Sequence, residues 1–351
     1  MVVLVAGLAG CNAVGPGVEG VVDLAPAGEE ELRLTYLGTG GWIMEHQGDQ
    51  ILAAPFFSNP AFLRAGLWTI EADTTEIDRW MSRYDVREAR LIVTGHAHYD
   101  HLMDVPRVAH RHAPSARILG SATVANTLGE WSGLSHRVDV VEEAEAGDQK
   151  TVGRWLRYGS VRIMPLRSHH APHFDGYTLY QGSRKNPLKT EPRTADQWLD
   201  GSTLAYLIDF LDAGGSVAFR VYYQDAVVAP PFGFAPDDLI SERPVDVAIF
   251  VPATFDQVDW HPEAFVENLR PRWVLLGHWE DFFVPVGEPT HSVPLSDIEH
   301  FEDRLTRVFD GPFWRPDIGT EFRFPKGRGG RGPDDDAATS GPGRVSPSPS
   351  G

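Results

Sequence analysis

The sequence predicts an α/β domain in which short strands alternate with amphipathic helices. Short apolar runs of the β type recur along the chain, and segments with helical periodicity lie between them. Several of these runs lead directly into a histidine or an aspartate, which are common metal ligands. Because strand ends hold side chains rigidly, this repeated order predicts a functional site at one edge of a sheet.

The predicted strands are runs rich in Val, Ile, Leu and aromatic residues. Gln47-Gly48-Asp49 is expected to fold one run into a hairpin, and the turn at residues 212–215 joins two later runs in the same way. Strands are predicted at Leu32–Leu37, Trp42–Ala53, Leu91–Thr94, Val161–Leu166, Leu204–Leu211, Val217–Tyr223, Val247–Val251 and Val274–Leu276.

Two helices have clear sequence signals. The segment Thr75–Tyr84 places Ile77, Trp80, Met81 and Tyr84 on one face, as a helix packed on a core requires. Further along, Ser296 and Glu299 have the spacing of a capping box, which predicts the start of an amphipathic helix that runs through Val308.

Residues 31–325 are predicted to form one domain, because the 42% hydrophobic content is enough for a sizeable core and no internal repeat is visible. Residues 12–30 read as a flexible tether rich in Gly, Ala, Val and Pro. Residues 326–351 are predicted to be disordered, because they offer too little apolar surface to fold. Residues 174–201 interrupt the strand pattern as an insert.

The N-terminus predicts a lipid anchor. Residues 1–11 form a short apolar run that ends in the single cysteine, Cys11. Leu8-Ala9-Gly10-Cys11 resembles a bacterial lipobox, in which the signal peptide is cut before a lipid-carrying cysteine. The run departs from that pattern because no Lys or Arg precedes it. The resemblance implies a lipoprotein at the extracytoplasmic face of the bacterial cell envelope; a chance cysteine in an apolar N-terminus is the alternative.

Charge and cysteine content exclude other classes. A formal net charge of −18 argues against nucleic acid as the main partner, because phosphate binding needs clustered Lys and Arg. A single cysteine excludes an internal disulfide framework and a CxxC metal site. We therefore expect a small-molecule or lipid-like substrate.

The strongest motif is Thr-Gly-His-Ala-His-Tyr-Asp-His at residues 94–101, directly after a predicted strand. In an extended segment, side chains two residues apart point the same way, so His96 and His98 can share one ion. A turn after them would direct Asp100 and His101 toward a second ion. Neutral imidazole and carboxylate are ligands that Zn²⁺ prefers, and Mn²⁺ or Fe²⁺ would suit the same set.

This motif matches the HxHxDH signature of the metallo-β-lactamase superfamily, which the chain resembles over about residues 32–310. The resemblance implies a four-layer αβ/βα sandwich with a dinuclear site at one edge. It assigns His96, His98 and His169 to the first ion, and Asp100, His101 and His278 to the second, with Asp225 as the bridge. His170 and His173 are alternatives to His169.

Two such ions lower the pKa of a shared water, and the resulting hydroxide attacks an electrophilic carbonyl or phosphorus. Asp100 or Asp225 could orient that water, and His173 or a tyrosine could protonate the leaving group. The sequence therefore predicts a hydrolase for a phosphodiester, a lactone or a carboxylic ester. A nuclease of the ribonuclease Z type and a non-catalytic metal-binding lipoprotein are the alternatives.

The N-terminal half most resembles the branch that contains ascorbate-6-phosphate lactonases and N-acyl-phosphatidylethanolamine phospholipase D. The similarity lies in Leu37-Gly38, Trp42-Ile43-Met44 and residues 51–58. The chain departs from this branch at Ala54-Pro55, where the branch has Asp-Pro.

The insert at 174–201 carries Arg184, Lys185, Lys189 and Arg193 in a chain that is acidic overall. It is either a solvated loop or a lid over the metals. As a lid, it would use Arg184 and Lys185 to recognise an anionic substrate.

Overall fold

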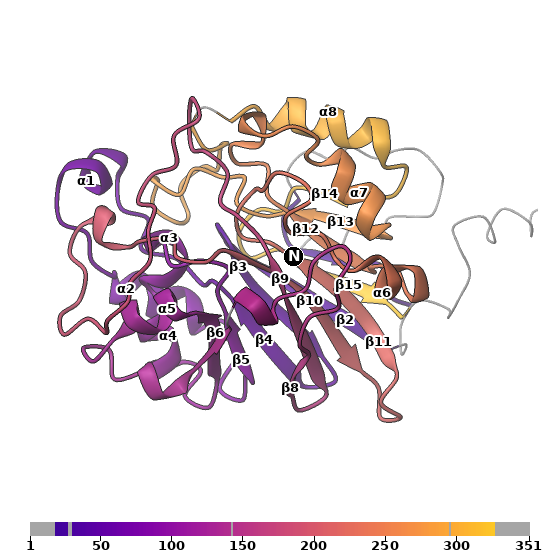
Figure 1. Ribbon diagram of the computed structural model, residues 1–351, viewed down its shortest axis with the longest axis horizontal. Coiled ribbons are helices and arrows are strands. Elements are labelled where there is room, and N and C mark those ends of the chain that lie inside the picture. The colour runs from indigo at the N-terminus through magenta and orange to yellow at the C-terminus, as the bar shows by residue number, and fades with distance from the viewer. Residues whose placement is uncertain (1–17, 27–29, 142, 295, 327–351) are drawn as a thin grey trace, which may run out of the picture.

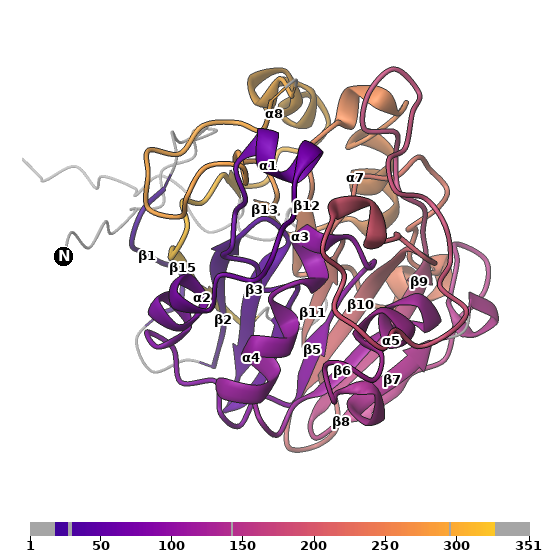
Figure 2. The ribbon, with the colours of Figure 1, turned by 90° about the vertical axis from the view of Figure 1, so that its left-hand side faces the viewer.

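Two β-sheets pack face to face at the centre of the molecule, and helices cover their outer faces (Figure 1). The computed structural model describes residues 18–26, 30–141, 143–294 and 296–326. A quarter-turn brings α2, α4 and α5 toward the viewer, in front of the strands of the first sheet (Figure 2). The order helix, sheet, sheet, helix is the predicted four-layer arrangement.

The first sheet has the strand order β1-β15-β2-β3-β4-β5-β6-β7 in the described residues. Strands β2 to β4 are antiparallel neighbours, whereas β4 to β7 run parallel. The strands are β1 Val21–Asp23, β2 Glu31–Gly38, β3 Gly41–His46, β4 Asp49–Ala53, β5 Leu91–Val93, β6 Arg117–Ser121, β7 Val138–Val141 and β15 Glu321–Pro325.

The second sheet has the order β14-β13-β12-β11-β10-β9-β8 over the same described ranges. Its strands β8 to β11 are antiparallel, and β11 to β14 are parallel. The strands are β8 Leu156–Tyr158, β9 Val161–Arg167, β10 Leu204–Leu211, β11 Val217–Tyr223, β12 Val247–Phe250, β13 Trp273–Leu276 and β14 Phe313–Trp314.

Helices occupy the two outer layers and some of the loops. The helices α2 Thr74–Met81, α4 Val105–Arg111 and α5 Ala122–Leu128 pack on the first sheet. The helices α6 Asp237–Glu242, α7 Glu263–Leu269 and α8 Ile298–Val308 pack on the second. The short helices α1 Phe62–Leu67 and α3 Tyr99–Leu102 lie in loops, as do the 3₁₀ turns Ser135–Arg137, Glu143–Glu145, Ala195–Gln197 and Phe255–Gln257.

The alternation of side chains along each strand explains why one sheet serves two cores. In β4, Ile51 and Ala53 join the core between the sheets, whereas Leu52 joins the core under α2, α4 and α5. In β5, Ile92 also joins the core under α2, α4 and α5. Successive side chains of a strand point to opposite faces, so near-continuous apolar runs are required where both faces are buried.

Each predicted strand is present, with ends within one residue of the prediction. The hairpin between β3 and β4 turns at the predicted Gln47-Gly48, where both residues have positive φ. The predicted helix at residues 75–84 is α2, which ends earlier, at Met81.

Two predictions are corrected. The cap of α8 is Asp297, whose side chain accepts a hydrogen bond from the backbone N–H of His300, whereas Ser296 donates to Pro252. Part of the segment predicted as a tether is a strand, since β1 pairs in parallel with β15. Cys11 and the predicted tail beyond Lys326 lie outside the described residues.

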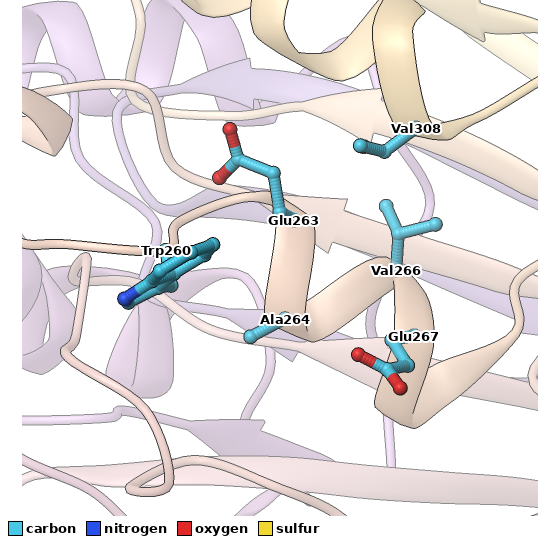
Figure 3. A pocket seen from close by; sticks show the side chains of 6 residues that line it. All are labelled: Trp260, Glu263, Ala264, Val266, Glu267 and Val308. Carbon is cyan, nitrogen blue, oxygen red and sulfur yellow. The ribbon is translucent and has the colours of Figure 1, made fainter.

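Within the described ranges, no helix has both the length and the apolar character that crossing a membrane requires. A shallow hollow of about 260 Å³ lies on the outer face of α7 and α8, between Trp260, Glu263, Glu267 and Val308 (Figure 3). Its walls belong to the outer helical layer rather than to the strand ends that carry the predicted ligands.

Candidate metal centre

Seven histidines and aspartates converge from loops at the carboxyl ends of strands in both sheets. The loop after β5 carries His96 and His98 and leads into α3, which carries Asp100 and His101. Strands β9, β11 and β13 of the second sheet lead to the others, which are His170, Asp225 and His278. Residues far apart in sequence therefore meet where the edges of the two sheets face each other.

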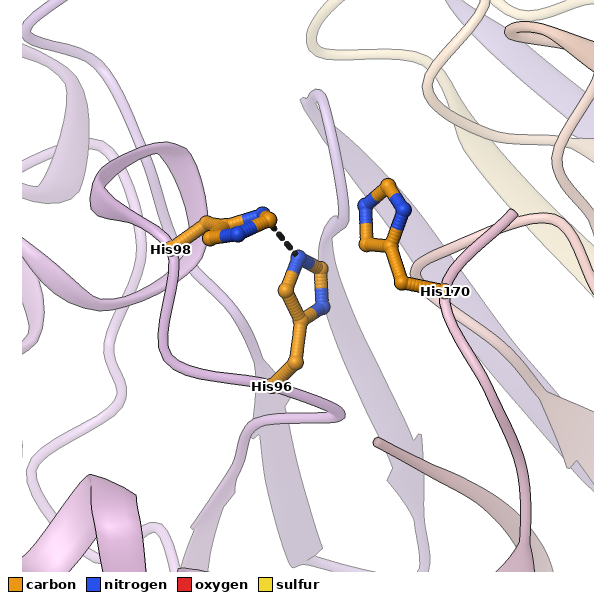
Figure 4. Close-up of side chains that lie close together, drawn as sticks. All are labelled: His96, His98 and His170. Atoms are coloured by element: carbon orange, nitrogen blue, oxygen red, sulfur yellow. Dashed lines mark hydrogen bonds between the residues drawn. The ribbon is translucent and has the colours of Figure 1, made fainter. Parts of the chain in front are cut away.

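The first group is His96, His98 and His170 (Figure 4). His96 Nε2 lies 3.1 Å from His98 Nδ1. The ring of His170 lies 4.8 Å from that of His96 and 5.0 Å from that of His98, measured between centroids. Candidate ligand atoms of all three residues lie within 4.8 Å of one another, so they could hold one ion.

His170, which the sequence offered as an alternative, stands in this group, and His169, the ligand predicted first, lies outside it. The His169 side chain is exposed and packs edge-on against Phe232, with 4.1 Å between the ring centroids. Because neighbouring side chains on extended backbone point to opposite sides, only one of the two histidines can face His96. His170 Nδ1 lies 2.7 Å from the carbonyl oxygen of Ala171, which leaves Nε2 as the free ligand atom.

The second group is Asp100, His101 and His278. Asp100 Oδ2 lies 3.3 Å from His101 Nε2 and 3.3 Å from His278 Nε2. All three residues are buried. One carboxylate and two imidazoles directed at the same point form a second set that could hold an ion.

Asp225 lies between the two groups, as the predicted bridge requires. Its Oδ1 is 3.0 Å from His96 Nδ1, and its Oδ2 is 3.5 Å from His101 Nδ1. The backbone N–H of Gly95 donates to Oδ2 at 2.7 Å, which fixes the carboxylate in place. One carboxylate thus contacts a residue of each candidate ion site.

The spacing of these atoms fits metal ligation. Two nitrogen ligands of one tetrahedral zinc ion are about 3.3 Å apart, given Zn–N distances near 2.0–2.1 Å. The contacts within the two groups, 3.1 and 3.3 Å, are close to that value. His98 Nε2 and His278 Nδ1 are buried without a hydrogen-bonding partner, which is costly in an apolar core, so the donor set fits a metal centre.

Burial keeps the imidazoles of the first group neutral. It lowers the pKa of His96 and of His170 well below the ordinary value, and it lowers the pKa of His98 to about 4. A neutral imidazole has the free lone pair that a metal ion needs. The first group can therefore accept an ion at neutral pH without losing protons first.

In the second group, unlike the first, neighbouring charges favour the ionised forms of the side chains. Burial would raise the pKa of Asp100, but the charge and hydrogen bond of His101, together with His278, hold it well below its usual range. Burial would likewise lower the pKa of His101, but Asp100 and Asp225 outweigh it and raise that pKa. Asp100 therefore stays negatively charged.

Two glycines allow the ligands to approach the backbone. A Cβ at Gly95 would lie 2.1 Å from Asp225 Oδ1, and a Cβ at Gly40 would lie 2.7 Å from His101 Nδ1. Tyr223 donates a hydrogen bond of 2.8 Å to the carbonyl of Gly40 and so ties this loop to β11. Any larger side chain at either glycine would displace a ligand.

His278 is held in the left-handed region, with φ of 51°. Its backbone N–H donates to the Thr39 carbonyl at 2.7 Å and to the Tyr36 hydroxyl at 3.0 Å. Glu280, which is buried, accepts hydrogen bonds from the Tyr36 hydroxyl and from the Thr39 N–H. Sequence reasoning missed Tyr36, Thr39 and Glu280, because their role depends on contacts between distant loops.

The two ends of the insert lie against the candidate metal centre. The ring of His173, just before the insert, stacks on His170 at 4.5 Å and lies 5.7 Å from that of His98. Tyr180 approaches the ring of His98 to 6.1 Å. The backbone of Asp200 accepts a hydrogen bond from Ala97, inside the HxHxDH motif.

Arg184 and Lys185, the predicted substrate-binding residues of the insert, make no hydrogen bond or ion pair with the histidine cluster in the described residues. Arg184 is fixed by backbone hydrogen bonds to Thr123 and Asn126 of α5, and its guanidinium donates to the Gln197 carbonyl. Lys185 is exposed beside it. These contacts join Arg184 to α5 and to the insert itself rather than to the histidine cluster.

No family model matches the chain. Over 98 residues the chain is 33% identical to a UPF0173 metal-dependent hydrolase of Aeropyrum pernix, a stretch that covers 28% of this chain and 33% of that protein. The chain thus matches about a third of the length of this curated relative.

Solved structures share the fold at low sequence identity. Igni18, a metallo hydrolase from the archaeon Ignicoccus hospitalis, matches with a TM-score of 0.52 and 16% identity, over 84% of this chain and 98% of that one. The isothiocyanate hydrolase from Delia radicum gut bacteria matches with a TM-score of 0.50 and 11% identity, over 84% and 99%. The mixed α/β architecture with two sheets is the metallo-β-lactamase fold, and this prediction is confirmed.

Proposed function

We propose that this protein is a metal-dependent hydrolase that holds two divalent ions and cleaves an ester-like bond. The observation that carries the proposal is the convergence of Asp100, Asp225 and five histidines into three overlapping groups of candidate ligands, in which Asp225, His96 and His101 link the other two. The partial identity to a protein named as a metal-dependent hydrolase supports the same activity.

His96, His98 and His170 would hold one ion, and Asp100, His101 and His278 the other, with Asp225 shared between them. Bound there, the ions would activate a water for attack and stabilise the negative charge that develops on the substrate oxygen. We propose Zn²⁺, because a set rich in imidazole suits this ion; Mn²⁺ and Fe²⁺ are alternatives. The scissile bond would belong to a phosphodiester, a lactone or a carboxylic ester.

The protein's own groups would complete the reaction. Asp100 stays anionic because His101 and His278 hold its pKa low, and Asp225 is fixed by the backbone N–H of Gly95. Either carboxylate could therefore orient the attacking water. His173 accepts a hydrogen bond at Nδ1 from the N–H of Leu179, 3.1 Å away, which leaves the proton of the neutral ring on Nε2. Burial lowers the pKa of His173, so the ring is neutral at neutral pH, and its Nε2–H would donate a hydrogen bond that stabilises the negative charge on a leaving-group oxygen.

Metal content and turnover test the proposal together. Full-length protein loaded with zinc should contain two ions per chain and hydrolyse at least one of a generic phosphodiester, a lactone and a carboxylic ester. His278→Ala should lose one ion and at least about a hundredfold in kcat/KM, or about 2.7 kcal/mol of transition-state stabilisation. The matched control is His291→Ala, since the His291 side chain is 61% exposed.

Two results would contradict the proposal. A content of one ion per chain that persists in excess zinc would exclude the dinuclear centre. A fully loaded protein that hydrolyses none of the three substrate classes would exclude the ester-like substrate.

We also propose that Cys11 carries a lipid and holds the protein at the cell envelope of a bacterium. The support is the lipobox-like sequence at Leu8–Cys11 alone. In a bacterial host the protein should label with a radioactive fatty acid and sediment with membranes, and Cys11→Ser should remove the label. Equal labelling of the two proteins would exclude this cysteine as the anchor.

A further inference from the structure

Helix α1 carries a group of exposed apolar side chains. Phe62 is 62% exposed, Leu63 64%, Leu67 70% and Trp68, just after the helix, 59%. Ala65 is the one buried residue of α1. Four large apolar side chains exposed within seven residues are unusual on a soluble protein and point to an interaction site.

A row of aromatic rings joins α1 to the candidate metal centre. The ring of Phe62 lies 5.0 Å from that of Phe283, which lies 4.4 Å from Phe282, and Phe282 lies 5.1 Å from His278. Asn59, just before α1, donates a hydrogen bond of 2.8 Å to the Val284 carbonyl and so fixes α1 to the same loop. The exposed apolar surface therefore continues to a candidate ligand.

The exposed side chains of α1 can enter one flat apolar medium together. Residues of an α-helix turn by about 100° each, so Leu63 and Leu67, four residues apart, lie on the same face, and Trp68 follows directly after the helix. Figure 1 shows α1 projecting from the body of the molecule, where a flat bilayer surface could reach it.

The composition of α1 and the charge of the chain indicate which apolar medium α1 would enter. Phe, Leu and Trp are the residues that enter the interfacial region of a bilayer. The one basic residue of α1, Arg64, donates to the Thr69 carbonyl and lies 3.8 Å from Glu71. With a formal net charge of −18, the chain would be repelled by an anionic membrane, so the matching surface is zwitterionic.

We propose that α1 inserts Leu63, Leu67 and Trp68 into the surface of a zwitterionic lipid bilayer, and that the substrate is a lipid ester which reaches the metal centre past Phe283 and Phe282. The assignment of the substrate rests on the proposed hydrolase function. The insertion of α1 does not.

Vesicle binding tests the insertion directly. All proteins are full length and carry Cys11→Ser, so that a lipid on Cys11 cannot supply the affinity. Binding to phosphatidylcholine vesicles is measured by flotation. The double variant Leu63→Asp with Leu67→Asp should bind at least tenfold more weakly than its parent, and Trp68→Ser should also bind more weakly. Trp260→Ser is the matched control, because Trp260 is 69% exposed but precedes α7.

The insertion would be overturned if the parent does not float with vesicles, if the double variant binds like the parent, or if Trp260→Ser loses as much as Trp68→Ser. Binding that appears only when anionic lipid is added would also overturn it. A dimeric parent that the same substitutions make monomeric would show that α1 is a protein interface instead.

Turnover tests the substrate. The double variant should hydrolyse a soluble short-chain ester like the parent, but lose at least tenfold on a lipid ester presented in vesicles. Equal loss on both substrates would overturn the lipid assignment. A parent that floats with vesicles but hydrolyses nothing would overturn the hydrolase function and the lipid substrate, while supporting the insertion of α1.

Discussion

Two neighbouring histidines, His169 and His170, differ in their position relative to the first candidate ion site. His170 points to His96 and His98, whereas His169 is exposed against Phe232. We expect His170→Ala to lose about one metal ion per chain and most of the activity, and His169→Ala to keep both ions. Elemental analysis of each loaded variant measures this. Loss of an ion from His169→Ala, with full content in His170→Ala, would return the ligand role to His169.

This contrast shows how far residue patterns can predict a site. Four candidate ligands, from His96 to His101, fall in one short motif, and each belongs to a group that could hold an ion. The choice within His169-His170 depends on which way the backbone turns after β9, and that turn is set by contacts with Val227, to which the Ala171 N–H donates. Local sequence holds no information about such a contact.

A buried carboxyl near the motif gives a pH-dependent prediction. Burial raises the pKa of Asp104 to about 7, although the N–H groups of Phe57 and Ser58 and the Ser58 hydroxyl donate to it. In the unfolded chain this group would ionise near its ordinary value of 3.8. The folded protein therefore binds the proton more tightly, and the stability that this contributes is full below about pH 4 and lost as the pH rises to about 7.

Asp104→Asn keeps a neutral side chain of the same shape at every pH. The free energy of unfolding of this variant should therefore rise relative to wild type by about 2 kcal/mol between pH 5 and pH 7. Denaturant titrations of both proteins at the two pH values measure the difference. A difference that stays constant with pH would mean that Asp104 is ionised in the folded protein throughout this range.

At the scale of elements, the cap of α8 is the clearest test. The Asp297 side chain accepts a hydrogen bond of 3.0 Å from the His300 N–H, one of the otherwise unpaired donors of the first turn. Asp297→Ala should lower the free energy of unfolding by about 1 kcal/mol. Glu299→Ala, in the same turn but exposed, should change it by less than about 0.5 kcal/mol. Equal effects in urea titrations would contradict this assignment of the cap.

Elements with strong local patterns were predictable, and others were not. The strands β10 and β11 have the predicted ends, because two long apolar runs flank an Asp-Ala-Gly-Gly turn. Strands β1 and β15 pair across almost the whole chain, so neither has a partner nearby in sequence. The helices α4, α5 and α7 are seven residues each, too short for periodicity to stand out.

At the scale of the whole molecule, the cores do not depend on the metal centre. One apolar core lies between the sheets and under α7 and α8, and the other lies under α2, α4 and α5. We therefore expect chelation to leave the fold intact while lowering the Tm by about 5 °C or more, because ions that bind only the folded state stabilise it. Circular dichroism before and after chelation, and after zinc is restored, measures both effects. Loss of secondary structure on chelation at 25 °C would contradict this expectation.

The division of the candidate ligands between the two sheets limits what a part of the chain can do. Loops of the first sheet supply His96, His98, Asp100 and His101, and loops of the second supply His170, Asp225 and His278. A truncated product that ends before β9 would keep the HxHxDH motif intact yet contain none of the candidate ligands from the second sheet. In a fragment of the gene the signature would therefore survive without a complete candidate centre, and we expect the three later positions to decide whether a catalyst is encoded.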